Sequence, residues 1–310
     1  MAEWQLKTPV VFIIFKRPDT TERVFEVIRQ TKPTKLLVVA DGARTDRPGE
    51  ADKCAAVRAI IERVDWDCEV LKNYSEINLG CGKRVASGLD WVFDNVEEAI
   101  ILEDDCLPNP TFFRFCEELL ERYRYDTRIS SISGQNVQLG CRRTEYSYYF
   151  SRYPHIWGWA TWKRAWQHFD FDMKLWTEIK ARGFLSDILI DPQAVKFWTN
   201  AFQHSYDGQT NNWDYQWTFA CWIQNGLSVL SNVNLVSNIG FGAESTHTLA
   251  GESEYANLPI EAMEFPLKHP PFMVRDMQAD NFTQKNLFHL SLLQRFKFKA
   301  KNILNELMIK

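Results

Sequence analysis

The 310-residue sequence has little that would place the protein in a membrane or in an oxidising compartment. Its longest apolar runs fall far short of the roughly 20 residues that cross a bilayer as a helix. The first residues lack the basic start, apolar run and small-residue cleavage site of a secretory signal. The seven cysteines are odd in number and contain no C-x-x-C pair, so we expect neither a disulfide framework nor a zinc knuckle. We therefore expect a cytoplasmic protein whose cysteines are reduced and mostly buried.

The sequence also lacks an excess of positive charge and a familiar phosphate-binding loop. With 36 Lys and Arg against 40 Asp and Glu, the formal net charge of −4 argues against electrostatic binding of nucleic acid. No G-x-x-x-x-G-K-[ST] segment is present, and no G-x-G-x-x-G opens a helix after the first predicted strand. A nucleotide phosphate would therefore need another counter-charge, such as a divalent metal.

Aromatic residues, in contrast, are abundant. The chain has 12 Trp, 10 Tyr and 21 Phe, and they crowd between Tyr146 and Trp222. Crowding of this kind favours a heavily packed core. The alternative interpretation is a set of ring faces that stack against sugars or a nucleobase.

The first 135 residues alternate between two hydrophobic periodicities. Continuous apolar runs rich in β-branched residues predict buried strands, and amphipathic stretches between them predict helices. The predicted strands are Pro9–Phe15, Lys35–Asp41, Cys68–Asn73, Glu98–Asp105 and Ile129–Ser133. The predicted helices are Thr20–Gln30, Gly49–Val64, Gly82–Asn95 and Asn109–Tyr123. This alternation predicts an α/β fold with a mostly parallel, Rossmann-like sheet flanked by helices.

After Gly134 the pattern changes to an aromatic-rich half. Helices are predicted at Asp191–Asp207 and Trp213–Asn225, and short strands at Leu227–Leu230 and Asn234–Val236. We expect one domain over residues 1–250, with halves at 1–135 and 136–250, and a C-terminal extension over residues 251–310. Its last part, Leu287–Lys310, predicts an amphipathic helix with a basic face. That helix either packs with its basic face in solvent or makes a peripheral contact with the inner face of an anionic membrane.

The strongest local signal is the acidic triplet Glu103-Asp104-Asp105, directly after the apolar run of the fourth strand. Adjacent carboxylates repel one another and need a counter-charge. Hard oxygen ligands suit Mg²⁺ or Mn²⁺, and such an ion can bridge the phosphates of a nucleoside diphosphate. The alternative is a solvated acidic turn that caps the next helix. Arg17 and Asp41 also lie at or just past the carboxyl ends of predicted strands, and ligands of α/β sheets bind at these strand ends.

The stretch Asn78–Phe115, which contains the triplet, resembles the GT-A glycosyltransferases. The likeness is greatest to the N-acetylglucosaminyltransferase I type and to bacterial sugar transferases of surface polysaccharides, and it extends roughly from Pro9 to Thr248. The resemblance implies inverting, Mn²⁺- or Mg²⁺-dependent transfer of a sugar from a nucleoside-diphosphate donor, namely a UDP-sugar. The acceptor would be a hydroxyl of a glycan or of a lipid-linked molecule, in the synthesis of bacterial glycans or surface polysaccharides.

The resemblance also assigns roles around the metal. Asp105, the last acid of the triplet, corresponds to the family's metal ligand, and Glu103 and Asp104 correspond to residues against the donor ribose and phosphates. His247, in a late Gly/Ser/Thr loop, matches a histidine that several of these enzymes place on the metal or the diphosphate. From the sequence alone, a lone histidine in such a loop is more often a surface residue.

Four further residues are assigned to the donor by the same resemblance. Arg17 matches an arginine near the nucleobase and phosphates, and Asp41 matches an aspartate that accepts a hydrogen bond from uracil. Lys83 or Arg84 matches a basic position that touches the donor.

Asp214, within the segment from Asn212 to Trp217, is the candidate catalytic base. An inverting transfer needs one carboxylate to take the proton of the acceptor hydroxyl. Flanking aromatic rings would desolvate this acid in part. Its alternative role is an N-cap for the helix that follows. The resemblance favours the base.

Two other functions compete with the transferase. A sugar-phosphate nucleotidylyltransferase would need a glycine-rich loop after the first strand, and the segment from Phe15 to Val24 contains no glycine. A non-catalytic module that binds a glycan or a nucleotide on the same fold is the alternative that we retain.

Overall fold

The main strands form one mixed sheet in the computed structural model, which describes residues 4–241 and 255–288. The strand order is β3-β2-β1-β4-β8-β6-β9-β7, and β1 pairs in parallel with both β2 and β4. Its strands are β1 (Val10–Ile14), β2 (Lys35–Ala40), β3 (Glu69–Tyr74), β4 (Glu98–Glu103), β6 (Ile129–Ser133), β7 (Tyr148–Ser151), β8 (Trp159–Trp162) and β9 (Leu227–Ser231). Two short strands, β5 (Cys106–Pro108) and β10 (Val236–Asn238), pair separately and antiparallel. The α/β fold with a mostly parallel sheet is confirmed.

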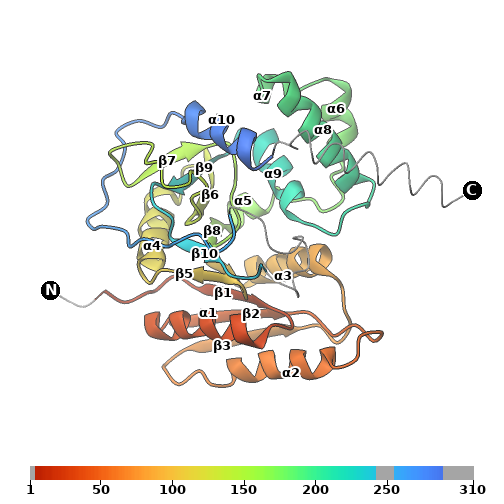
Figure 1. Ribbon diagram of the computed structural model, residues 1–310, viewed down its shortest axis with the longest axis vertical. Helices are drawn as coiled ribbons and strands as arrows, with labels where there is room; N and C mark the ends of the chain where they lie inside the picture. Colours follow the sequence, from red (N-terminus) through yellow and green to blue (C-terminus); the bar gives the residue numbers. More distant parts are fainter. Residues whose placement is uncertain (1–3, 242–254, 289–310) are drawn as a thin grey trace, which may run out of the picture.

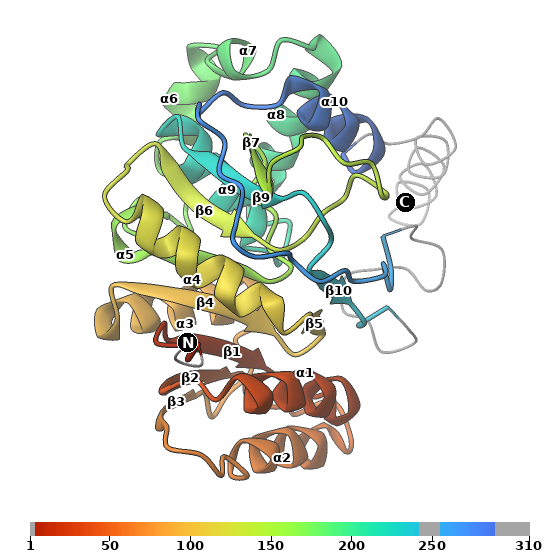
Figure 2. The same ribbon diagram turned by 90° about the vertical axis from the view of Figure 1, so that its left-hand side faces the viewer.

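Helices cover both faces of this sheet (Figures 1 and 2). Successive residues of a strand point to opposite faces, and β1 shows the result: Val10 and Phe12 join one core, and Val11 and Ile13 join the other. The first core includes side chains of α1 (Pro18–Thr31), α2 (Glu50–Ile61) and α4 (Thr111–Tyr123). The second includes those of α3 (Cys81–Asn95), α5 (Lys163–Trp166), α8 (Pro192–Tyr206) and α9 (Asp214–Ile223). Burial on both faces explains why these strands are continuously apolar.

The predicted elements of the first half are confirmed, each close to its predicted bounds. In the later half α8, α9 and β9 are confirmed, and the strand predicted at Asn234–Val236 lies slightly later, as β10. Several short elements were not predicted: β5, β7, β8, α6 (Trp176–Ala181), α7 (Leu185–Ile188) and α10 (Met277–Asn286). The strands and short helices among them have three to six residues, too few to display a periodicity.

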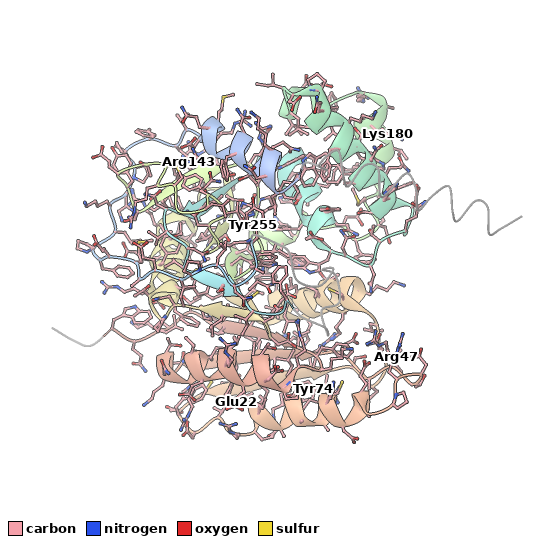
Figure 3. The ribbon with its side chains drawn as sticks, in the orientation of Figure 1. Glu22, Arg47, Tyr74, Arg143, Lys180 and Tyr255 are labelled. Carbon is pink, nitrogen blue, oxygen red and sulfur yellow. The ribbon has the colours of Figure 1, made fainter. Side chains whose placement is uncertain are left out.

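The later half is built into the same sheet. Strand β8 inserts between β4 and β6 and runs antiparallel to both. Helix α10 is tied to the end of β7, because the Asp280 carboxylate accepts hydrogen bonds from Ser151 Oγ at 2.6 Å and Arg152 Nε at 3.1 Å. Figure 3 shows the two ends of the molecule, with Glu22 on α1 at one and Lys180 on α6 at the other. The proposed boundary at residue 250, His247 and residues 289–310 of the predicted last helix lie outside the described residues.

Aromatic crowding in the later half is core packing. The indole rings of Trp159 and Trp213 stack with centroids 5.6 Å apart, and Trp166 stacks on Phe169 at 4.2 Å. The tryptophans with almost no exposed surface are Trp159, Trp162, Trp176, Trp198, Trp213 and Trp217. All the cysteines are free, and Cys54, Cys106, Cys116 and Cys221 are buried, as expected. Within the described ranges, no helix combines the length and the apolar character needed to cross a membrane.

The packing of α3 on β2 generates a stability prediction. A Cβ atom at Gly88 would lie 2.4 Å from Val39 Cγ1. Alanine is normally the better helix residue, but here the added methyl group overpacks a dense core, so we expect Gly88→Ala to lower the free energy of unfolding by about 1–2 kcal/mol. Urea unfolding would measure the change. Ser87→Ala, at the exposed neighbouring position, is the control and should change it by no more than about 0.5 kcal/mol; an unchanged or more stable Gly88→Ala would contradict the prediction.

Candidate functional site

One cleft lies at the carboxyl ends of β1, β2 and β4. These strands are parallel and adjacent, so the residues that follow them meet at one edge of the sheet. The cleft has a volume of about 620 Å³. Among the residues that line it are Phe15, Lys16, Arg17, Asp41, Arg44, Asn78, Arg84, Glu103, Asp104 and Asp105. Most of the predicted donor-site residues are therefore brought together.

Another part of the cleft lining comes from the later half of the chain. Trp157, in the segment between β7 and β8, and residues 210–215, at the start of α9, line it. Asp214 is the first residue of α9, and Trp213 before it occupies the cap position without a side-chain cap bond. The fold therefore places Asp214 in the same cleft as the acidic triplet, although 108 residues or more separate them in the sequence.

The three acids of the triplet have different surroundings. The Asp104 carboxylate is buried and accepts hydrogen bonds from Phe15 N at 3.0 Å and from Arg17 Nε and Nη2 at 3.1 and 2.5 Å. Asp105 Oδ2 lies 2.9 Å from the same Arg17 Nη2. Burial lowers the pKa of Arg17, but the charges of Asp104 and Asp105 outweigh it and raise this pKa above its usual value. Arg17 thus supplies part of the counter-charge that the triplet needs.

Glu103 differs from the other two acids in its contacts. No hydrogen bond or ion pair within residues 4–241 and 255–288 involves its carboxylate. Burial first, and then the negative charges of Asp105, Asp104 and Asp214, raise the pKa of Glu103 to about 8 against the opposing effect of Arg17. Burial also raises the pKa of Asp104, to about 6, against the charge of Arg17. A cation near Glu103 and Asp105 would relieve this accumulation of negative charge.

The donor atoms fit a nucleotide-bound metal better than a metal held by protein alone. No group of three or more His, Cys, Asp or Glu side chains in the described part of the chain is arranged to hold a metal ion. A magnesium or manganese ion that binds a nucleotide needs only one or two carboxylates, because phosphates and water complete its shell. Asp105 and Glu103 offer such oxygens in the cleft. His247, the other predicted ligand, lies outside the described residues.

The carboxylate of Asp41 is already hydrogen-bonded by protein donors, most of them in the loop before α3. Its Oδ1 accepts hydrogen bonds from Gly42 N and Leu79 N, each at 2.9 Å, and its Oδ2 accepts from Asn78 Nδ2 and Gly80 N, each at 3.0 Å. A carboxylate offers about four acceptor positions. A uracil N–H would therefore have to displace one of these bonds, a competition that the local sequence pattern does not predict.

The two basic candidates on α3 differ. Arg84 is buried, and its guanidinium donates to Ala40 O at 3.1 Å and to Asn73 O and Oδ1 at 2.6 and 2.5 Å. These bonds join the ends of β2 and β3, so Arg84 supports the floor of the cleft. Lys83 is exposed and is not among the lining residues.

Two cations that sequence reasoning missed stand at the rim. Lys16 Nζ and the Arg44 guanidinium lie 5.6 and 5.9 Å from the centroid of the Phe15 ring. Glu50, the first residue of α2, holds both: it accepts from Lys16 Nζ and Arg44 Nε, each at 2.9 Å. Lys16 directly precedes Arg17 after the first strand, which was a usable signal. No sequence signal pointed to Arg44, because only the folded loop before α2 brings it to the cleft.

Comparisons with known proteins add little. No protein-family model matches the chain, and no curated protein matches it. Among solved structures it is similar to UDP-glucose pyrophosphorylase complexed with UDP-glucose. The TM-score is 0.35 and the sequence identity 11%, over 73% of this chain and 90% of that chain. A likeness this weak does not inform the ligand or the reaction of this chain.

The Glu50 cluster generates a pH prediction. Hydrogen bonds, first from the Arg44 side chain, lower the pKa of Glu50 to about 2 from its ordinary 4.5, despite burial. The stabilisation is therefore complete above pH 4.5 and is lost as the pH falls towards about 2. We expect Glu50→Gln to be less stable than the wild type by about 1–3 kcal/mol at pH 7.

Urea unfolding at pH 7 and at pH 3 would measure this difference, which should be smaller at pH 3. Asp52→Asn, an exposed acid in the same turn of α2, is the control. A difference that stays constant or grows towards low pH would contradict the assignment.

Proposed function

We propose that the protein is an inverting glycosyltransferase that uses a nucleoside-diphosphate sugar, with UDP as the nucleotide. One observation carries the proposal: a single cleft is lined by the strand-end acids Glu103 to Asp105, by Arg17, and by Asp214 from the later half of the chain. This reaction requires carboxylates at the donor diphosphate and a separate carboxylate at the acceptor.

The donor end of the cleft would be the edge formed by β1, β2 and β4. Arg17, Lys16 and Arg44 place positive charge there, and such charge attracts and orients a diphosphate. A divalent ion held by Asp105 and Glu103 would help to neutralise the charge that develops on the departing nucleoside diphosphate. Asp41, with its four protein partners, shapes this end by holding the loop from Asn78 to Gly80 rather than by reading the base.

Asp214 would act on the acceptor. Its carboxylate takes the proton as the acceptor hydroxyl oxygen forms a bond to the anomeric carbon of the sugar. The bond from that carbon to the diphosphate oxygen breaks in the same step, and the leaving group keeps the electron pair. Attack on the face of the anomeric carbon away from the departing diphosphate would invert the configuration without an enzyme-bound intermediate.

The acidic end of the cleft is tested by nucleotide binding. Thermal unfolding in the presence of a panel of nucleoside diphosphates, with and without Mn²⁺, should show a Mn²⁺-dependent stabilisation by UDP. At about 100 times the dissociation constant the ligand adds roughly 2.7 kcal/mol. The shift should vanish in Asp105→Ala and persist in Asp94→Ala, an exposed acid on α3. No shift with any nucleotide in the presence of Mn²⁺ would refute the donor site.

Asp214 is tested by separating binding from turnover. Asp214→Asn should bind UDP within about threefold of the wild-type affinity but release UDP from UDP-sugars at least 100-fold more slowly, because a general base typically contributes about 10²–10⁴ in rate. Asp172→Asn, an exposed acid of the later half, is the control. UDP binding without release of UDP from any UDP-sugar by the wild type, with glycan acceptors present, would favour the non-catalytic binding module instead.

A further inference from the structure

The segment that leads into Asp214 rests on a helix from the other half of the chain. Residues 207–213 connect α8 to α9, and residues 210–213 line the cleft. Asn211 Oδ1 accepts a hydrogen bond from Gly82 N at 3.0 Å, across 129 positions of sequence. Gly82 is the second residue of α3, whose own cap residue, Gly80, offers no side chain. Because the first N–H groups of a helix lack partners within it, Asn211 serves as a side-chain cap supplied from outside.

Two glycines make this close contact possible. A Cβ atom at Gly82 would lie 2.7 Å from the backbone oxygen of Asn212, and one at Gly80 would lie 2.8 Å from Asn211 Nδ2. Gly80 also has a φ of +79°, which other residues rarely adopt. The first turn of α3 is therefore shaped to receive the segment before Asp214.

Both partners in this contact are held by further hydrogen bonds. On one side, Thr210 Oγ1 donates to Asn212 Oδ1 at 2.5 Å, which fixes the turn that contains Asn211. On the other side, Asp41 holds Gly80 N at 3.0 Å at the end of β2. A continuous series of bonds thus runs from the floor of the cleft through α3 to the residue three positions before Asp214.

We propose that Asn211 is a positioning residue, which fastens the segment before α9 to α3 and thereby sets the place of Asp214 relative to the strand-end acids. This role rests on the proposed function. Asn211 would act through Asp214, and its loss should lower the turnover rate while UDP affinity stays nearly the same. A cap with only a structural role would change stability and leave the rate of the folded protein unaltered.

The test compares Asn211→Ala, Asn211→Asp and Gly82→Ala with the wild type. UDP affinity would be measured by calorimetry with Mn²⁺, and turnover by release of UDP from UDP-sugars. Asn211→Ala and Gly82→Ala should release UDP about 10- to 100-fold more slowly, since a shift of about 1 Å in a reacting group costs rates of this order. Their UDP affinity should change less than about threefold. Asn211→Asp keeps an acceptor oxygen at a helix N-terminus and should recover most of the rate.

Two controls make the outcomes distinguishable. Asn200→Ala, an exposed asparagine on α8, should match the wild type in both measurements. Hydrogen exchange of the Gly82 amide should be faster in Asn211→Ala than in Asn211→Asp or the wild type, whatever the reaction is. Unchanged exchange would refute the contact itself.

Unchanged UDP release in Asn211→Ala, with release by the wild type, would overturn the positioning role and leave the proposed function intact. A loss of UDP affinity as large as the loss of rate would make Asn211 a donor-binding residue and overturn the role as well. If the wild type released no UDP from any UDP-sugar, the proposed function would fail, and the role of Asn211 with it.

Discussion

The pairing of one guanidinium with two adjacent carboxylates makes this cleft possible. Asp104 and Asp105 follow a strand whose central residues are all buried, and like charges in such a low-dielectric environment are costly. Arg17 bonds to both, and a glycine fits over the pair: a Cβ atom at Gly240 would lie 2.1 Å from Asp105 Oδ2 and 2.5 Å from Arg17 Nη1. Glu103, outside this pairing, remains the acid whose charge is least compensated.

The polar residues of the site divide into those that build it and those that remain available to a ligand. Asp41, Arg84 and Glu50 have their hydrogen-bonding groups engaged by the protein: Asp41 holds the loop before α3, Arg84 joins two strand ends, and Glu50 holds the rim cations. Glu103 and Lys16 keep more of their hydrogen-bonding capacity for a ligand. A cleft assembled from loop ends needs such internal bonds, because buried backbone N–H and C=O groups must be satisfied.

The aromatic residues of the later half also divide into two groups, those that fill the core and those that line the cleft. Most tryptophans of the later half fill the second core, where rings at the start of α9 pack on Trp159 of β8 and Trp198 of α8 packs on Trp222 of α9. Trp157 differs, because it lies in a connecting segment and lines the cleft. The rigid aromatic core also gives α9 a fixed place, and Asp214 at its first residue takes its position from that packing.

The sequence alone determined the sheet of the first half and the position of its acids. The runs from Val10 to Ile14 and from Ala99 to Leu102 are continuously apolar, so the pattern predicted buried strands there, and adjacent parallel strands end at one edge of the sheet. The antiparallel insertion of β8, the bonds that occupy Asp41 and Arg84, and the contact of Asn211 with Gly82 were decided only by the tertiary structure. Each depends on groups far apart in the chain, and local pattern holds no information about which distant donor will meet which acceptor.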